Sequence, residues 1–101
     1  MYFPRKWLLY TALVVCPCLI AGCTRNPEVR KKKFADKGDS YFQQGKYREA
    51  AIEYENAIQI DPGYAKAHYQ LAQCFLKRGD WVRGYQELMR TVDIEPQNLK
   101  A

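Results

Sequence analysis

A period of 34 residues in the C-terminal two-thirds of the chain constrains the fold more than any other feature. When the sequence is compared with itself at this offset, Gly45 pairs with Gly79 and Pro62 pairs with Pro96. Residues of similar type pair at the same offset: Tyr41 with Phe75, Phe42 with Leu76, Tyr47 with Trp81, Ala50 with Gly84 and Ile60 with Ile94. Agreement at glycine, proline and apolar positions together indicates two tandem copies of one structural unit.

Within each unit the apolar residues recur with helical spacing. In KFADKGDSYFQQ they are three and four positions apart, and the same pattern returns in YREAAIEYENAIQI after Gly45. Pro62 ends the second segment because proline cannot continue a helical hydrogen-bond ladder. Asn26 and Pro27 fit an N-cap and a first helical residue, so we expect the first helix to begin near Pro27. No stretch alternates with period two, which predicts an all-α fold of antiparallel helical hairpins without a sheet.

This pattern resembles the tetratricopeptide repeat (TPR), with one repeat at residues 31–64, a second at 65–98, and a tail or the start of a third at 99–101. The family's small and aromatic positions fall on Gly38, Tyr41, Ala50, Tyr54, Ala57 and Pro62, and then on Leu71, Ala72, Phe75, Gly84, Leu88 and Pro96. The departures are Lys37 in place of leucine, His68 in place of a large aromatic residue and Thr91 in place of alanine. The resemblance implies an α-solenoid whose small residues let the helices approach closely.

Such solenoids bind a peptide or a partner helix on the face lined by the first helix of each pair. The candidate binding residues on that face are Asp39, Phe42 and Gln43 in the first unit, and Tyr69, Gln70, Gln73, Leu76 and Lys77 in the second. The family's carboxylate clamp for chaperone tails needs a Lys and an Asn four residues apart on the first helix. Ala35 and Asp39 stand there instead, so the resemblance does not extend to that ligand.

The chain begins with a short apolar run that fits a secretory signal peptide. Arg5 and Lys6 supply its positive start, and residues 7–21 are uncharged and mostly apolar. This run is shorter than the ~20 apolar residues that a spanning helix needs, and Pro17 interrupts it. Residues 1–22 are therefore interpreted as a cleavable signal helix, with an uncleaved membrane anchor as the alternative.

The run ends in Ile20-Ala21-Gly22-Cys23, which resembles the lipobox of bacterial lipoproteins. The resemblance implies that the Cys23 thiol carries a diacylglyceryl group and that a signal peptidase cuts before it. Residues 23–30 would then be the lipidated cysteine and a basic tether. Several acyl chains hold a protein firmly on a membrane. Thr24, where an aspartate commonly signals inner-membrane retention, favours the periplasmic face of the outer membrane.

The net charge of +5 belongs to the N-terminal part of the chain. From residue 34 onward there are nine basic and ten acidic residues, so the repeats are close to neutral and nucleic-acid binding is not expected. The basic cluster at Arg30–Lys33 either attracts anionic lipid headgroups or is a solvated start of the first helix.

The sequence carries no recognisable catalytic constellation. The single histidine, His68, has no nucleophile implied by spacing, and we expect a packing or surface residue. Cys74 lies on the apolar side of its helix and is expected to be buried. The four cysteines form neither a disulfide framework nor a metal site, and no cofactor is predicted. The chain is not expected to be an enzyme.

Two classes of function remain at this stage. The first is a membrane-anchored adaptor that holds a protein partner at the bacterial cell envelope, as in assembly, pilus biogenesis, secretion or polysaccharide export. The second is a small structural lipoprotein that self-associates through its second repeat, where Val82, Tyr85 and Met89 lack a neighbour. The chain could also be the N-terminal part of a longer repeat protein, because solenoids generally need three or more repeats.

Overall fold

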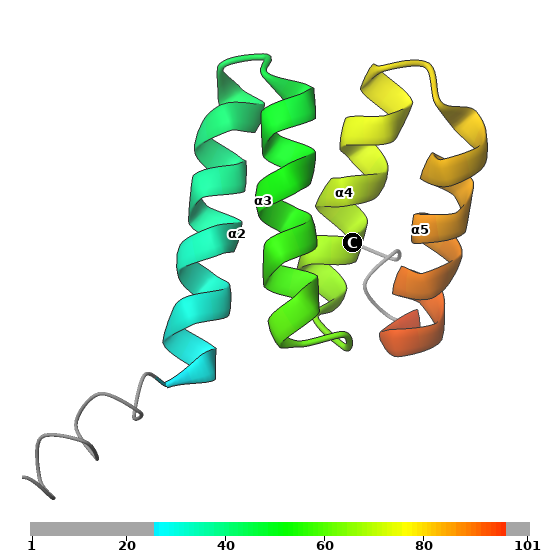
Figure 1. Cartoon of the computed structure of the whole chain (residues 1–101). Helices are drawn as coiled ribbons and strands as arrows, with labels where there is room; N and C mark the ends of the chain where they lie inside the picture. The colour runs from blue at the N-terminus through cyan, green and yellow to red at the C-terminus, as the bar shows by residue number, and fades with distance from the viewer. Residues whose placement is uncertain (1–25, 97–101) are drawn as a thin grey trace, which may run out of the picture.

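The computed structural model describes residues 26–96, and every regular element in that segment is a helix. The helices are α2 (Pro27–Gln43), α3 (Tyr47–Ile60), α4 (Ala65–Lys77) and α5 (Trp81–Ile94). They stand side by side in chain order, each antiparallel to the one before it (Figure 1). The all-α prediction is therefore confirmed for residues 26–96. The predictions for residues 1–25, Cys23 included, and for residues 97–101 lie outside this segment.

The helix boundaries follow the expected local signals. The Asn26 side chain accepts a hydrogen bond from the Glu28 backbone N–H at 3.0 Å, and Pro27 occupies the first helical position. The predicted start of the first helix is therefore confirmed. Gly45 and Gly79 follow α2 and α4 with φ values of 75° and 80°. This left-handed conformation favours glycine, which explains why the two glycines recur in phase.

The core lies between the two hairpins. Its main cluster joins α3 to α4 and consists of Ala50, Ala51, Tyr54, Leu71, Cys74 and Phe75. A second cluster of Ala35, Ala57 and Ala67 takes one alanine from each of α2, α3 and α4. The prediction that Cys74 is buried is confirmed, since its side chain has no exposed surface. The small side chains allow the helices to pack closely, and α3 is covered on both sides.

Two glycines sit where a side chain would collide with the neighbouring helix. A Cβ atom on Gly38 would lie 2.6 Å from the Tyr54 ring, and one on Gly84 would lie 2.7 Å from the Leu76 side chain. Both distances are shorter than carbon atoms tolerate. Gly38 therefore sets the α2–α3 approach and Gly84 the α4–α5 approach, as the sequence indicated.

The first helix has a polar outer side. In α4, Ala67, Leu71 and Cys74 are buried in the clusters that include α3. Their partners at the 34-residue offset in α2 are Lys33, Lys37 and Ser40, all exposed. The replacement of leucine by Lys37 is thus explained by its position, because no helix among residues 26–96 covers that side of α2.

The last described helix has an apolar outer side. In α3, Ala51 is 4% exposed because α4 covers it, whereas its partner Tyr85 in α5 is 64% exposed. Val82 and Met89 are also exposed. The prediction that these three residues lack a neighbour is confirmed within the described segment. The two ends of the helical row therefore differ in chemistry, with charge on α2 and apolar surface on α5.

Candidate functional site

The first helices of the two hairpins share one face, as a TPR-like stack requires. The Lys66 Nζ at the start of α4 lies 3.2 Å from Asp39 Oδ2 in the middle of α2. This ion pair bridges the two helices directly, although α3 stands between them in the chain. The surface formed by α2 and α4 is called the α2/α4 face below.

Asp39 is held in place by a side chain from α3 as well as by Lys66 from α4. The Tyr54 hydroxyl of α3 donates a hydrogen bond to Asp39 Oδ1 at 2.5 Å. Burial, together with this bond to a carboxylate, raises the pKa of the Tyr54 hydroxyl far above its usual range, so it stays protonated. Asp39 therefore presents a fixed, partly exposed carboxylate that Tyr54 and Lys66 orient.

Two of the predicted binding residues also pack within the fold. Phe42 is half-buried and meets the Tyr47 ring edge-on, with the centroids 5.1 Å apart. Its partner at the 34-residue offset, Leu76, is half-buried and faces Gly84 of α5. Both side chains therefore take part in the contact between the helices of their own hairpin, and only part of each is available to a ligand.

The remaining predicted binding residues lie on the surface of α2 and α4 and are polar or aromatic. Their exposure ranges from intermediate to high for Gln43, Tyr69, Gln70, Gln73 and Lys77. Amide and ammonium groups there could donate hydrogen bonds to the backbone carbonyls of a bound peptide.

Inside the second hairpin, His68 makes a buried polar contact. Its Nε2 lies 2.7 Å from the Pro62 carbonyl oxygen and its Nδ1 lies 2.7 Å from Glu87 Oε2. A carbonyl oxygen only accepts, so Nε2 must carry a proton. Arg90 Nη1 lies 2.6 Å from the other Glu87 oxygen, Oε1. The cluster ties α4 to α5 and to the turn before α4.

Glu87 is the residue of this cluster that sequence reasoning missed. Glutamate side chains are rarely buried unless they are paired, yet Glu87 is 7% exposed. The 34-residue offset pairs Glu87 with Glu53, and it pairs His68 with Phe34. Glu53 accordingly has a buried oxygen, Oε2, without a hydrogen-bond partner in the described segment. The recurrence of glutamate at this position in both units is the sequence feature that could have indicated a buried carboxylate.

Three further features of residues 26–96 concern metal binding, thiol reactivity and membrane spanning. No group of three or more His, Cys, Asp or Glu side chains among residues 26–96 is arranged to hold a metal ion. Burial raises the pKa of the Cys74 thiol to about 11, which keeps it in the unreactive protonated form. No helix in the same segment has both the length and the apolar character needed to cross a membrane.

The described segment is thus a helical-repeat module of two antiparallel hairpins. Residues 38–79 match the family model described as TPR repeat. The matched residues run from within α2 to the turn after α4, so the similarity to this repeat family covers the two facing hairpins in part.

Several curated proteins are similar to this chain over the same length of sequence. Hsp70-Hsp90 organizing protein 1 of Glycine max is 34% identical over 66 residues, which are 65% of this chain and 12% of that protein. A tetratricopeptide repeat and J domain-containing co-chaperone, DNJ1, of Cryptococcus neoformans is 33% identical over 64 residues, 59% of this chain and 12% of that protein. Sperm-associated antigen 1 of Homo sapiens is 32% identical over 66 residues, 65% of this chain and 7% of that protein. The similarity therefore spans a small part of each relative.

Proposed function

We propose that this chain is a membrane-anchored TPR lipoprotein that acts as a non-catalytic adaptor and holds a protein or peptide partner at the bacterial cell envelope. The observation that carries the proposal is the α2/α4 face, where Asp39 is fixed by Tyr54 and Lys66 beside exposed amide groups. A preorganised polar face binds an extended or helical peptide with little loss of side-chain freedom.

The envelope location rests on the residues at the start of the chain. Ile20-Ala21-Gly22-Cys23 resembles a lipobox, and lipidation of Cys23 would place the repeats at the membrane surface. Thr24 favours the periplasmic side of the outer membrane. The names of some relatives refer to organizing Hsp70 and Hsp90, but we do not propose a chaperone tail as the ligand here. Ala35 is fully buried and Asp39 carries a negative charge, so neither attracts a carboxylate.

The anchor and the binding face are tested separately. The intact mass of the protein extracted from its native envelope should equal that of Cys23–Ala101 plus acyl chains. A mass that retains Met1–Gly22 without acyl groups would contradict the lipoprotein assignment.

For the binding face, a photo-crosslinking residue at Gln73 on α4 should capture a defined partner in the native cell. The matched control is the same residue at Gln86, which is exposed on α5. Introducing Asp39→Ala into the Gln73 probe should reduce capture by about tenfold, a typical loss for one charge-assisted contact. Equal capture at both positions, unaffected by Asp39→Ala, would argue against the α2/α4 face.

Self-association through the second repeat is the second candidate function, and one observation favours it. Trp81, Val82, Tyr85 and Met89 form an apolar stripe along the outer side of α5, and they are 69%, 70%, 64% and 42% exposed. Exposed apolar surfaces of this kind commonly bind another protein surface.

A further inference from the structure

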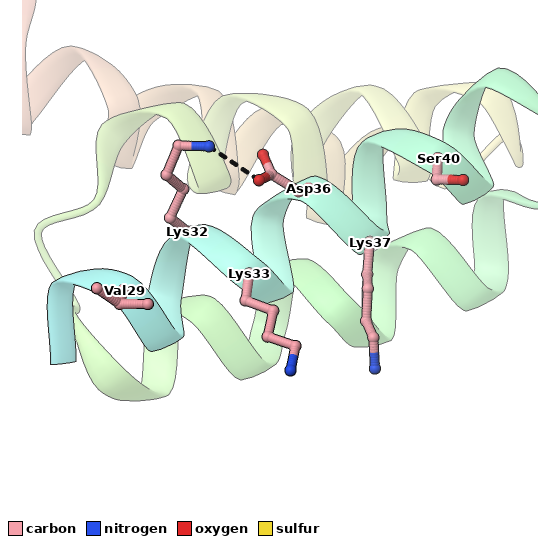
Figure 2. A pocket seen from close by; sticks show the side chains of 6 residues that line it. All are labelled: Val29, Lys32, Lys33, Asp36, Lys37 and Ser40. Atoms are coloured by element: carbon pink, nitrogen blue, oxygen red, sulfur yellow. Dashed lines mark hydrogen bonds and ion pairs between the residues drawn. The ribbon is translucent and has the colours of Figure 1, made fainter. Parts of the chain in front are cut away.

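The outer side of α2 carries positive charges that form no ion pair within residues 26–96. Lys33 and Lys37 are both exposed, and neither joins an ion pair with any residue among 26–96. Figure 2 shows their side chains extending together to one side of the helix, away from the pair that Lys32 makes with Asp36. A free cationic edge therefore runs along α2, and it is called the lysine edge below.

The neighbouring lysines are engaged within the fold. Lys31 Nζ lies 2.6 Å from Asp61 Oδ2, 2.9 Å from Glu28 Oε2 and 4.8 Å from the centre of the Tyr64 ring. Its side chain is only 15% exposed. Of the Arg30–Lys33 run, Arg30 and Lys33 are therefore exposed without an ion pair among residues 26–96, and Lys37 lies one helical turn beyond Lys33.

The lysine edge includes an apolar residue at its N-terminal end. Val29 is 64% exposed and lies four residues before Lys33, which places it on the same side of the helix. These residues, together with Ser40 and the paired side chains of Lys32 and Asp36, line a shallow depression of about 580 Å³ along one side of α2 (Figure 2). Because the lining comes from a single helix, the surface suits a broad partner better than an enclosed small molecule.

We propose that the lysine edge lies on an anionic lipid surface and fixes the orientation of the repeats on the membrane. The inference rests on the proposed anchor at Cys23, since only three residues separate that cysteine from Pro27. An extended linker of this length spans at most about 14 Å. Lysine ammonium groups are attracted to anionic headgroups, and exposed Val29 can contact the acyl boundary.

The geometry favours a helix that lies flat on the bilayer over one that stands upright. Lys33 and Lys37 are about 9 and 15 Å beyond Pro27 along the helix axis. The Debye length at physiological ionic strength is about 8 Å, so an upright α2 would leave Lys37 largely screened. A flat α2 brings both ammonium groups and Val29 to the surface at once.

This orientation has a consequence for the rest of the molecule. The helices stand in a row from α2 to α5 (Figure 1), so α5 becomes the helix farthest from the membrane. With about 10 Å between neighbouring helix axes, the apolar stripe of α5 would stand roughly 30 Å from α2. The α2/α4 face then opens sideways, where a partner can reach it without displacing lipid.

The test is lysine acetylation of the full chain in nanodiscs, read for each lysine by mass spectrometry. One set of discs contains phosphatidylcholine alone, and the other also contains about 30% phosphatidylglycerol. Lys77 serves as the internal reference, since it is exposed at the C-terminal end of α4, and α3 separates α4 from α2. We expect acetylation of Lys33 and Lys37, relative to Lys77, to fall about fivefold in anionic discs and to recover at ~0.5 M salt.

Single variants complete the test. Lys33→Gln should weaken the protection of Lys37, Lys37→Gln should weaken that of Lys33, and the control Lys46→Gln should leave both protected. Equal labelling in the two kinds of disc would overturn the proposal. Protection that is the same in neutral discs, or that grows with the number of chains per disc, would also overturn it in favour of an uncharged or protein contact. The intact mass of the same sample reports whether Cys23 is acylated, so failure of the anchor is distinguishable from failure of the contact.

Discussion

At the scale of single residues, the His68–Glu87 contact is a buried polar contact that joins the two helices of the second hairpin. Replacing His68 by Ala would leave the buried Glu87 carboxylate with Arg90 alone and the Pro62 carbonyl without its donor. We expect His68→Ala to lower the free energy of unfolding by about 2–3 kcal/mol, measured by chemical denaturation.

The exposed neighbour Gln86 supplies the control for His68, since Gln86→Ala should change stability by less than about 0.5 kcal/mol. The double variant His68→Ala/Glu87→Ala should lose less than the sum of the two single losses, because removing both partners leaves no orphaned charge. Additive losses would show that the two side chains act independently.

A second prediction at this scale concerns Cys74. Burial raises the pKa of its thiol to about 11, so at pH 8 only about one molecule in a thousand holds the thiolate. Peptide-level mass spectrometry should find alkylation by iodoacetamide at least about a hundredfold slower in the native chain than in the denatured chain.

The same shift predicts a dependence of stability on alkaline pH. The folded-state pKa lies above the unfolded value of about 8.5, so folding opposes loss of the proton. The contribution of Cys74 to stability is therefore complete below about pH 8.5 and declines as the pH rises toward 11. Cys74→Ala should remove the decline between about pH 8.5 and 10, below the range in which Tyr54, whose pKa is also raised, begins to contribute. A decline that persists in that window would assign it to other groups.

At the scale of helices, the distance between the two helices of each hairpin depends on a glycine, which has no side chain. Gly38→Ala would place a Cβ 2.6 Å from the rigid Tyr54 ring, which is buried and cannot move aside. We expect a net destabilisation of about 1–2 kcal/mol, even though alanine gains up to about 1 kcal/mol in helix propensity. Thermal unfolding measures the change.

Two other glycines calibrate this effect. Gly84→Ala meets the flexible Leu76 side chain, which can rotate, so its loss should be smaller than that of Gly38→Ala. In Gly63→Ala the nearest atom is Asp61 Oδ1 at an ordinary 3.5 Å, and stability should stay within about 0.5 kcal/mol. A Gly38→Ala protein as stable as the Gly63→Ala protein would mean that α2 and α3 can separate at little cost.

The helices and turns could be predicted from the sequence because their signals are local. Gly45, Gly79 and Pro62 act on the backbone beside them, and the apolar period sets the buried side of each helix. The polar contacts could not be predicted, because they join residues far apart in sequence. The pairing of His68 with Glu87 bridges 19 residues, and that of Lys31 with Asp61 bridges 30. Both depend on the relative rotation of packed helices, which no local pattern encodes.

The candidate binding site also divides into residues that local signals predict and contacts that depend on helix packing. The helical period placed Asp39 and Gln73 on the surface of first helices, and a bridge between those helices exists. Leu76 was predicted for this face as well, but its side chain also fills the space left by Gly84, a contact that depends on how closely α5 approaches α4. The membrane anchor rests on sequence alone and remains a prediction.

At the scale of the whole molecule, the two ends of the helical row differ in what they can bind. The outer side of α2 carries Lys33 and Lys37 at positions where α4 buries Ala67 and Leu71. The outer side of α5 carries apolar residues at the positions that, in the equivalent helix α3, are covered by α4. A head-to-tail contact between copies would press lysines against the apolar stripe and leave them desolvated without partners, which is unfavourable. Of these two arrangements, a contact that pairs α5 with α5 is therefore favoured.

The last prediction concerns the oligomeric state. Tyr85 lies centrally in the apolar stripe of α5, and a charge there would be buried without a partner in an α5–α5 contact. We expect the detergent-solubilised full chain to dimerise with rising concentration in sedimentation velocity, and Tyr85→Lys to weaken the dimer by at least about tenfold. Ile52→Lys is the matched control, because Ile52 is a 51%-exposed apolar residue on α3, outside the stripe, and should leave the dimer intact. Lys33→Gln should likewise have no effect. A chain that stays monomeric at all concentrations would exclude self-association through α5.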